Sequence, residues 1–381
     1  MKPLPLSPLR PVRVEAFVFR CPIATPVRTS FGTMNDRPAL FVRVEDSDGA
    51  VGWGEVWCNF PSCGAEHRAR LLETVMAPLL TGRSYAGPAE AFVWLSEKTA
   101  VLAIQSGEPG PMAQAIAGID TALWDLCARR AGLPLWRYLG GTGDEIGVYA
   151  SGINPDRPQD LAAARQAEGY RAFKLKVGFG EQRDLANLAA LRELLGPDTP
   201  LMVDVNQGWT LEEGLANAPK FERFDLRWLE EPLRADRPWS EWQALAAATR
   251  IPLAGGENLA STSAFDEAIA KGSWAVLQPD LAKWGGISGC WPVIEKAMAA
   301  GLHYCPHYLG GGIGLLASAH VLAAAGGAGM LEIDANPNPL RSALAGPLSV
   351  IEEGRARLGS RPGLGIEPDL AALAQLAAAG C

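Results

Sequence analysis

One repeat constrains the fold of this chain more than any other feature of its sequence. From Ile146 to Asp334, short apolar segments of strand length alternate with longer segments of helical periodicity. The eight apolar segments are IGVYAS, AFKLKV, PLMVDV, LRWLEE, PLAGGE, AVLQPD, LHYCPH and MLEID. Strands that alternate with helices form parallel βα units, and a parallel sheet of eight strands closes into a barrel. The sequence therefore predicts an α/β fold built on a TIM-type barrel.

The chain before this repeat has a different pattern. The segments VRVEAFVFR and ALFVRVEDSDGAVGWGEV read as antiparallel strands, with a turn at Asp48-Gly49. Residues 64–81 and 111–131 carry apolar side chains at helical spacing. We therefore assign residues 1–143 to an α+β module and residues 144–335 to the barrel. The Pro-rich start of residues 336–381 predicts a segment that leaves the barrel and returns to the first module.

Charge and composition exclude several classes of partner. The 381 residues have a formal net charge of -8, which argues against nucleic acid and against anionic lipid. Prolines interrupt the N-terminal segment MKPLPLSPLRPVRVEAFVF, so we predict no export signal and expect a cytoplasmic protein. The uncharged segment from Gly310 to Leu331 approaches the length of a membrane span, but its Gly, Ala, Ser and His content favours a buried barrel helix.

Titratable residues occur where the predicted strands end. The third to eighth strands end in turn at Asp204, Glu230, Glu257, Asp280, His307 and Glu332, at intervals of 26, 27, 23, 27 and 25 residues. The carboxyl ends of parallel strands converge on one mouth of a barrel, where barrel enzymes hold their active sites. We therefore interpret these residues as one site. The alternative is that the acids cap helices or pair with barrel arginines.

The first three carboxylates of this series, Asp204, Glu230 and Glu257, indicate a divalent-metal site. Neighbouring carboxylates repel one another, and one of the three would be protonated unless a cation lay between them. Hard oxygen ligands with open coordination positions suit Mg²⁺. The sequence thus predicts magnesium as the cofactor.

Two lysines lie on the second predicted strand. Lys174 and Lys176 are two residues apart, so both point to the same side of the strand, into the barrel or its mouth. Two ammonium groups beside a dication should lower the pKa of Lys176 toward the range of a general base. Lys174 is placed to bind a carboxylate oxygen of the substrate and to help lower the pKa of its neighbour. The alternative is that both lysines extend to solvent.

The sixth and seventh strands supply an acid and a histidine. Asp280 and His307 can form a pair in which the carboxylate selects the imidazole tautomer and raises its basicity. A lone histidine in a barrel is more often a core residue, but the acid one βα unit earlier favours a catalytic role.

Together these residues resemble the enolase superfamily, in particular its mandelate racemase-like branch. The matching barrel motifs are Lys174-Leu175-Lys176, Asp204-Val205-Asn206, Trp228-Leu229-Glu230-Glu231-Pro232, Gly256-Glu257-Asn258, Gln278-Pro279-Asp280, Gly285-Gly286-Ile287, Pro306-His307 and Glu332. The first module matches in Gly52-Trp53-Gly54-Glu55, in Gly118-Ile119-Asp120-Thr121-Ala122-Leu123-Trp124-Asp125 and in Leu139-Gly140-Gly141. The resemblance therefore extends over essentially the whole chain.

The resemblance implies a modified TIM barrel, (β/α)7β, with an N-terminal α+β capping domain whose loops close the site. It implies that Asp204, Glu230 and Glu257 bind the metal with Asn206 behind them. Lys176 would be the base on one face of a small carboxylate substrate, and His307, supported by Asp280, the acid or base on the other. Glu332 would bind the substrate carboxylate as it becomes an enediolate. A symmetric homo-oligomer is also implied.

Asp280 differs from the corresponding residue of a neighbouring branch. In muconate lactonizing enzymes and dipeptide epimerases a lysine occupies this position, so Asp280 disfavours those activities. Lys283, three residues later, is expected outside the innermost shell of the site. Glu231 follows Glu230 on a strand and is expected to face away from it.

The same catalytic residues are compatible with two reactions. We favour the dehydration of a sugar acid to a 2-keto-3-deoxy acid, in which His307 protonates a leaving hydroxyl. The alternative is a racemase or epimerase, in which His307 returns a proton to the α carbon. A Schiff-base aldolase and a barrel without catalysis are less consistent with three clustered carboxylates.

Specificity is expected to come from two loops of the first module. The loop Pro22–Asp36 offers Arg28, which either binds a distal carboxylate or hydroxyl of the substrate or is a surface charge. The loop Trp57–Cys63 offers Asn59 and Phe60. Tyr308, next to His307, is expected to line the pocket.

Overall fold

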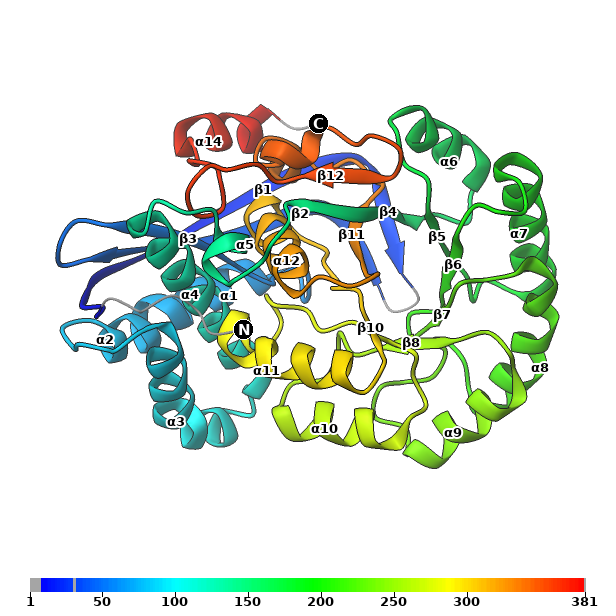
Figure 1. Ribbon diagram of the computed structural model, residues 1–381, viewed down its shortest axis with the longest axis horizontal. Coiled ribbons are helices and arrows are strands. Elements are labelled where there is room, and N and C mark those ends of the chain that lie inside the picture. The colour runs from blue at the N-terminus through cyan, green and yellow to red at the C-terminus, as the bar shows by residue number, and fades with distance from the viewer. Residues whose placement is uncertain (1–7, 30–31, 380–381) are drawn as a thin grey trace.

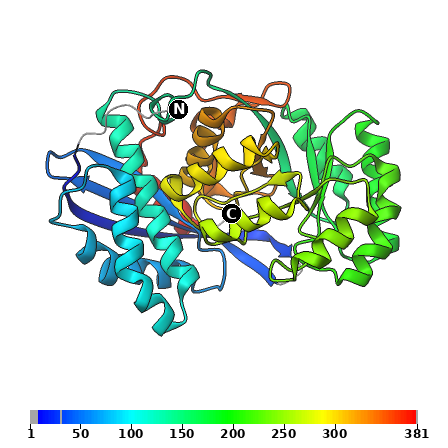
Figure 2. The same ribbon diagram turned by 60° about the horizontal axis from the view of Figure 1, so that its bottom comes forward.

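The computed structural model describes residues 8–29 and 32–379, which form a barrel and a capping module side by side (Figure 1). The strands of the barrel are surrounded by helices on one side of the molecule, and the sheet and long helices of the cap lie on the other (Figure 2). The α/β fold predicted from the repeat is confirmed.

The cap contains a three-stranded antiparallel sheet in the order β1-β2-β3. Its strands are β1 (Pro11–Thr29), β2 (Gly32–Asp46) and β3 (Val51–Val56). Its helices are α1 (Gly64–Leu71), a π-helical turn (Leu72–Met76), α2 (Ala77–Leu80), α3 (Pro88–Ser106), α4 (Pro109–Arg130) and α5 (Leu135–Tyr138). The predicted meander and both predicted helical regions are present, and α3 is an addition to them.

The barrel contains the eight predicted parallel strands. They are β4 (Glu145–Ile153), β5 (Phe173–Lys176), β6 (Leu201–Asp204), β7 (Leu229–Glu230), β8 (Leu253–Gly255), β9 (Val276–Leu277), β10 (His303–Tyr304) and β11 (Met330–Asp334). They pair in the order β10-β9-β8-β7-β6-β5-β4-β11. Among the described residues this ladder does not continue from β11 to β10, so the barrel is nearly closed rather than continuously hydrogen-bonded.

Seven helices connect these strands, which makes the barrel (β/α)7β. They are α6 (Pro158–Ala167), α7 (Glu181–Leu195), α8 (Leu211–Phe221), α9 (Trp239–Ala248), α10 (Thr262–Lys271), α11 (Gly286–Ala299) and α12 (Gly312–Ala325). No helix among the described residues is long and apolar enough to cross a membrane. The uncharged segment before Glu332 instead forms α12, which is buried along most of its length.

Two glycines of β3 explain how tightly the cap is packed. A Cβ atom on Gly54 would lie 2.0 Å from the carbonyl oxygen of Gly118, and one on Gly52 would lie 2.0 Å from that of Ala122. Only glycine allows α4 to approach the sheet at this distance. The two matched cap motifs therefore contact each other directly.

Buried carboxylates of the cap attach it to the barrel. Glu55 on β3 accepts hydrogen bonds from the backbone N–H groups of Gly311 and Gly314 at the start of α12. Asp120 on α4 accepts them from Ile287 and Ser288 at the start of α11, at 2.7 and 2.9 Å. Helix N-termini favour negative charge, so these contacts hold the cap over the barrel.

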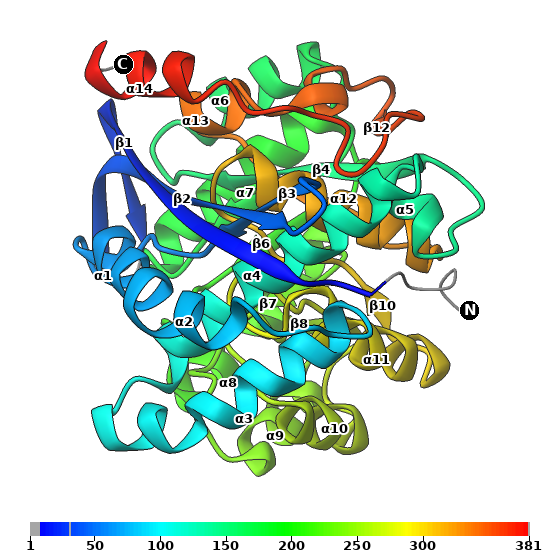
Figure 3. The ribbon, with the colours of Figure 1, turned by 90° about the vertical axis from the view of Figure 1, so that its left-hand side faces the viewer.

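The C-terminal segment crosses from the barrel to the cap (Figure 3). It contains α13 (Pro339–Ser342), a 3₁₀ turn (Gly346–Ser349), β12 (Arg355–Arg357) and α14 (Leu370–Ala379). β12 pairs antiparallel with β4, and α14 packs against β1. The domain boundaries at residues 143 and 335 stay predictions.

Candidate active site

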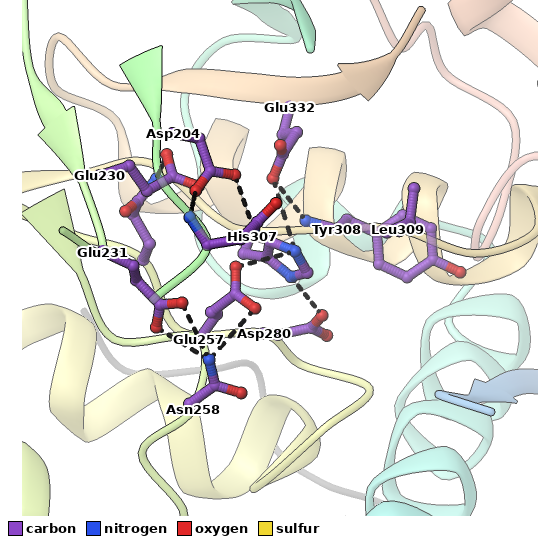
Figure 4. A network of polar contacts seen from close by, with 12 residues as sticks. Asp204, Glu230, Glu231, Glu257, Asn258, Asp280, His307, Tyr308, Leu309 and Glu332 are labelled. Carbon is purple, nitrogen blue, oxygen red and sulfur yellow. Dashed lines mark hydrogen bonds and ion pairs between the residues drawn. The ribbon is translucent and has the colours of Figure 1, made fainter. Parts of the chain in front are cut away.

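The three predicted metal ligands lie at the same end of neighbouring strands (Figure 4). Asp204 is the last residue of β6, and Glu230 is the last of β7 and stands opposite it in the strand register. Glu257 follows the end of β8 by two residues. All three side chains are buried. Burial raises the pKa of Glu230 to about 7, although Lys174 partly offsets this effect.

Both predicted lysines point into this cluster from β5. The Lys174 ammonium contacts Glu230, lies 2.8 Å from Oε1 of Glu332 and is fully buried. The Lys176 ammonium lies 2.7 Å from Oδ2 of Asp204 and 2.6 Å from Oδ1 of Asn206. Neither lysine extends to solvent, so the alternative reading of this strand is wrong.

The pKa of Lys176 differs from the prediction. Burial disfavours its charged form and Lys174 also lowers its pKa, but the carboxylates of Asp204 and Glu230 together outweigh these two effects. The protein groups by themselves therefore raise the pKa of Lys176. The prediction of a lowered pKa included a dication beside Asp204, and a carboxylate that is bound to a dication attracts an ammonium much less strongly.

His307 and Asp280 form the predicted pair. Nδ1 of His307 lies 2.7 Å from Oδ2 of Asp280, and its Nε2 lies 3.0 Å from Oε2 of Glu257. Burial opposes protonation of the imidazole, but Glu257, Glu332 and Asp280 outweigh it and raise the pKa of His307 to about 9. These carboxylates therefore favour the imidazolium, the form of His307 that can donate a proton.

Glu332 binds the other side of this cluster. Its carboxylate accepts hydrogen bonds from the hydroxyl of Ser151 and, at 3.1 Å, from the backbone N–H of Tyr308. Burial acts to raise its pKa, but Lys174 and His307 outweigh this and lower it. Tyr308 contributes this N–H, while its ring points away from the cluster (Figure 4) and its hydroxyl packs against Gly314. The structure does not bring the Tyr308 side chain to the site.

Lys283 and Glu231, to which the sequence assigned no catalytic role, lie close to Glu257. The ammonium of Lys283 lies 2.8 Å from Oε1 of Glu257, so it contacts a proposed metal ligand from outside the innermost shell of the site. Glu231 is buried and accepts hydrogen bonds from Asn258 at 2.8 and 3.0 Å. The backbone of Glu231 has a φ of 38°, which breaks the strand alternation on which the prediction for this residue rested.

Other polar partners of the cluster were missed. Trp228 donates its indole N–H to Glu230 at 3.0 Å, and Gln278 donates to the same carboxylate at 2.7 Å. Strand alternation could have identified both, because Trp228 is two residues from Glu230 and Gln278 is two residues from Asp280. Ser151 on β4 had no comparable signal, since the first strand ends without a titratable group.

The structure describes the side chains of only some residues in the two predicted specificity loops. The side chain of Arg28 lies outside the described residues. Asn59 is buried and donates to the carbonyl oxygen of Leu309 at 2.6 Å, so it positions the segment after His307. The ring of Phe60 packs against that of Trp57, with centroids 6.5 Å apart.

The donor chemistry of the three carboxylates fits Mg²⁺, while their contacts in the structure are to cations of the protein. The ammonium partners are Lys176 for Asp204, Lys174 for Glu230 and Lys283 for Glu257. As the described side chains stand, no group of three or more His, Cys, Asp or Glu residues could hold a metal ion. Buried carboxylates on neighbouring strands are nevertheless the oxygen donors that Mg²⁺ prefers. Metal binding would require each carboxylate to turn one oxygen toward the ion, while its other oxygen can keep the contact with its ammonium.

Family models match both parts of the chain. Residues 13–140 match the model of the mandelate racemase / muconate lactonizing enzyme N-terminal domain. Residues 158–372 match the model described as enolase C-terminal domain-like.

Curated relatives include cycloisomerases and a dehydratase. D-galactarolactone cycloisomerase of Agrobacterium fabrum is 32% identical over 92% of this chain and 94% of its own. The 3,6-anhydro-α-L-galactonate cycloisomerase of Streptomyces coelicolor is 32% identical over 96% of this chain and 99% of its own. Arabinonate dehydratase of Saccharolobus solfataricus is 31% identical over 84% of this chain and 86% of its own.

Solved structures share the whole fold. A mandelate racemase/muconate lactonizing enzyme from Bordetella bronchiseptica RB50 is 62% identical, with a TM-score of 0.93 over 97% of this chain and 100% of its own. A racemase from Streptomyces coelicolor with bound magnesium is 28% identical, with a TM-score of 0.85 over 96% and 99%. An enolase from Bradyrhizobium, complexed with magnesium and mandelic acid, is 29% identical, with a TM-score of 0.82 over 97% and 98%.

Proposed function

The chain belongs to the mandelate racemase/muconate lactonizing enzyme family of the enolase superfamily, and from this premise we propose that it is a sugar-acid dehydratase. It would remove the proton on the carbon next to the carboxylate, expel the hydroxyl of the following carbon and release a 2-keto-3-deoxy acid. The observation that carries this proposal is the His307–Asp280 pair, which can donate the proton that a leaving hydroxyl needs. The dehydratases among the relatives favour this use of the pair over racemisation.

Lys176 is the proposed base. It lies at the carboxyl end of β5 with its ammonium 2.7 Å from Asp204. Burial and Lys174 act to lower its pKa, and the raising effect of Asp204 would weaken once that carboxylate binds a dication. In its neutral form the Lys176 amine takes the α proton, and the electrons of the broken C–H bond move into the substrate carboxylate to form an enediolate. Asp204, Glu230 and Glu257 would hold Mg²⁺, whose charge stabilises the negative oxygens of an enediolate.

His307 is the proposed acid. As the enediolate collapses, its electrons form a carbon–carbon double bond, the C–O bond on the next carbon breaks, and His307 donates its proton to the departing oxygen as water forms. The resulting enol gains a proton on carbon 3, loses the proton of its carbon-2 hydroxyl and becomes the 2-keto acid. The products are one 2-keto-3-deoxy acid and one water, so the reaction needs no oxidant or reductant.

Lys174 and Glu332 are proposed to bind the substrate carboxylate. Lys174 is buried between Glu230 and Glu332. Burial disfavours its cation, but these two acids outweigh burial and raise its pKa well above the usual value, so Lys174 remains charged. Glu332 lies 4.0 Å from His307 Nε2. It would donate a hydrogen bond to the substrate carboxylate in its protonated form, which Lys174 and His307 disfavour. Contacts with the substrate carboxylate accelerate the reaction only if they strengthen as its charge grows in the transition state to the enediolate.

A cycloisomerase is the second candidate function. Two curated relatives that match nearly the whole chain are cycloisomerases. In a 3,6-anhydro sugar acid the ring oxygen is attached to carbon 3, which is also the carbon that loses its hydroxyl in a dehydration. The same base and acid would then open the ring, so the two candidates differ in the leaving oxygen. A racemase, the third possibility, would retain both oxygens.

One screen separates these functions. The purified enzyme with MgCl₂ is incubated in D₂O with aldonic acids, aldaric acids, their lactones and a 3,6-anhydro sugar acid, and the products are followed by NMR. We expect a 2-keto acid from an open-chain acid. Keto acid formed only from a cyclic acid would identify a cycloisomerase, and α-deuterium exchange without keto acid would identify a racemase. Activity that persists in EDTA would contradict the metal-assisted mechanism.

A further inference from the structure

Lys283 is a cation at the active site to which the mechanism assigns no task. Its ammonium lies 2.8 Å from Oε1 of Glu257 and 3.1 Å from Oδ1 of Asn258. Only 12% of its side chain is exposed, so the charge interacts with these oxygens rather than with water. Lys283 does not lie on a strand but in the loop between β9 and α11.

The contacts of Lys283 connect Glu257 to the proposed acid. The backbone N–H of Lys283 donates to Oδ1 of Asp280 at 3.3 Å, and the other oxygen of Asp280 binds His307. His307 in turn lies 3.0 Å from Oε2 of Glu257, while the Lys283 ammonium binds Oε1. Glu257 is therefore held from both sides, by an imidazole at one oxygen and an ammonium at the other. If the ammonium were removed, this carboxylate would be free to turn toward His307.

A cap residue covers the same lysine. The Lys283 ammonium lies 4.9 Å from the ring centroid of Trp57, within the range of a cation–π contact. The backbone N–H of Trp57 also donates to the carbonyl oxygen of Ala282 at 3.3 Å. Trp57 directly follows β3, so this pair joins the cap to the loop that carries Lys283.

We propose that Lys283 is a positioning residue, which orients Glu257 for Mg²⁺ and links that ligand to the cap through Trp57. This inference rests on the proposed function, because it takes Glu257 as a metal ligand. Lys283 contacts one oxygen of Glu257, as Lys174 and Lys176 contact Glu230 and Asp204, but it takes no part in the proposed proton transfers. Loss of a residue that orients a metal ligand typically weakens metal affinity or activity by about 10- to 100-fold.

The test is the affinity of the substrate-free enzyme for MgCl₂, measured by isothermal titration calorimetry. We expect Lys283→Met to weaken binding by about 10- to 100-fold and Lys283→Arg to stay within about threefold of the unsubstituted enzyme. Lys283→Gln is a second neutral replacement in case the Met variant does not fold. Lys98→Met is the matched control, because Lys98 makes a similar contact with Trp94 on α3, away from the site.

Each other outcome overturns the inference. Tighter binding by Lys283→Met would show that the ammonium acts on the ion by charge repulsion, and unchanged binding would show that Glu257 does not need it. Equal losses in the Met and Arg variants would show a general packing defect. If the unsubstituted enzyme does not bind MgCl₂, the proposed function fails as well, so the two failures are distinguishable.

The link to the cap is tested by a double-mutant cycle. We expect Trp57→Leu to weaken Mg²⁺ binding by about two- to fivefold, the size of a cation–π contact, when Lys283 is present. In the Lys283→Met background the same change should have no further effect. Equal losses in both backgrounds would show that Trp57 acts independently of Lys283 and would overturn this part of the inference.

Discussion

The two ends of the barrel carry the same kinds of charge in opposite surroundings. At the amino end, Arg171 lies 2.8 Å from Glu353, and 43% and 80% of these side chains are exposed. At the carboxyl end, Lys174 and Glu230 form a pair in which each side chain is 1% exposed. Exposed pairs contribute little to stability, whereas a buried charge that loses its partner is expensive. Stability alone does not account for a cluster of buried charges at the carboxyl end, and our proposal accounts for it by catalysis.

The largest expected effect is on the proposed base. Lys176→Met should lower kcat/KM by about 10³- to 10⁴-fold, because proton abstraction then lacks its acceptor. The measurement is keto acid formation from the best substrate of the screen. Arg171→Ala, at the other end, should leave the rate unchanged. A Lys176 variant with more than a tenth of the normal rate would assign the base elsewhere.

The next effect separates the two halves of the mechanism. His307→Asn should lower keto acid formation by about 10²- to 10³-fold, because the leaving oxygen is no longer protonated. Exchange of the α proton with D₂O should continue, since Lys176 is intact. Parallel NMR measurements of both rates test this split. If exchange and elimination fall together, His307 is required for the first step and its proposed role is wrong.

The stability of the two charge pairs gives a direct comparison. Lys174→Met leaves Glu230 and Glu332 buried without their ammonium and should lower the free energy of unfolding by about 3–5 kcal/mol. Arg171→Ala should lower it by about 0–1 kcal/mol. Urea denaturation in EDTA, followed by far-UV circular dichroism, measures both. Equal effects would mean that the different burial of the two ends has no energetic consequence.

The smallest effect is a pH dependence at the carboxyl end. The pKa of His307 is raised to about 9 in the folded protein, against about 6.5 for an exposed histidine. Its stabilising contribution is therefore complete below about pH 6.5 and is lost as the pH rises through about 9.

The measurement is the difference in free energy of unfolding between the unsubstituted protein and His307→Asn, in EDTA. As the pH rises from 6 through about 9, this difference should shift against the unsubstituted protein. Arg171→Ala should keep the normal pH profile. A constant difference between the His307→Asn and unsubstituted curves would contradict the raised pKa.

The positions of residues within a strand or directly at its end could be predicted, because regular strand geometry fixes them. The spacing of the six titratable residues located the carboxyl end of the barrel, and the alternation of β5 correctly placed Lys174 and Lys176 together. The prediction for Glu231 was wrong because its backbone leaves the strand conformation directly after Glu230. That change of direction depends on how β7 packs, and one strand's sequence does not specify it.

The partner of Lys283 was not predictable for a related reason. The loop after β9 folds back so that the Lys283 ammonium reaches Glu257, which follows β8, and the spacing from Asp280 does not specify this contact. The raised pKa of Lys176 could not be predicted from the sequence either, because it depends on the 2.7 Å contact with Asp204.

The periodic features of this protein could be predicted from its residues: eight strands with helices between them, a first module of different pattern, and a series of acids and bases at one end of the barrel. These features follow from local repetition, since hydrophobic period and strand alternation are properties of neighbouring residues. Tertiary structure alone decided which cation contacts which carboxylate and which cap residue covers them. Those contacts join residues that are far apart in the chain, and their distances set the electrostatic energies on which the chemistry depends.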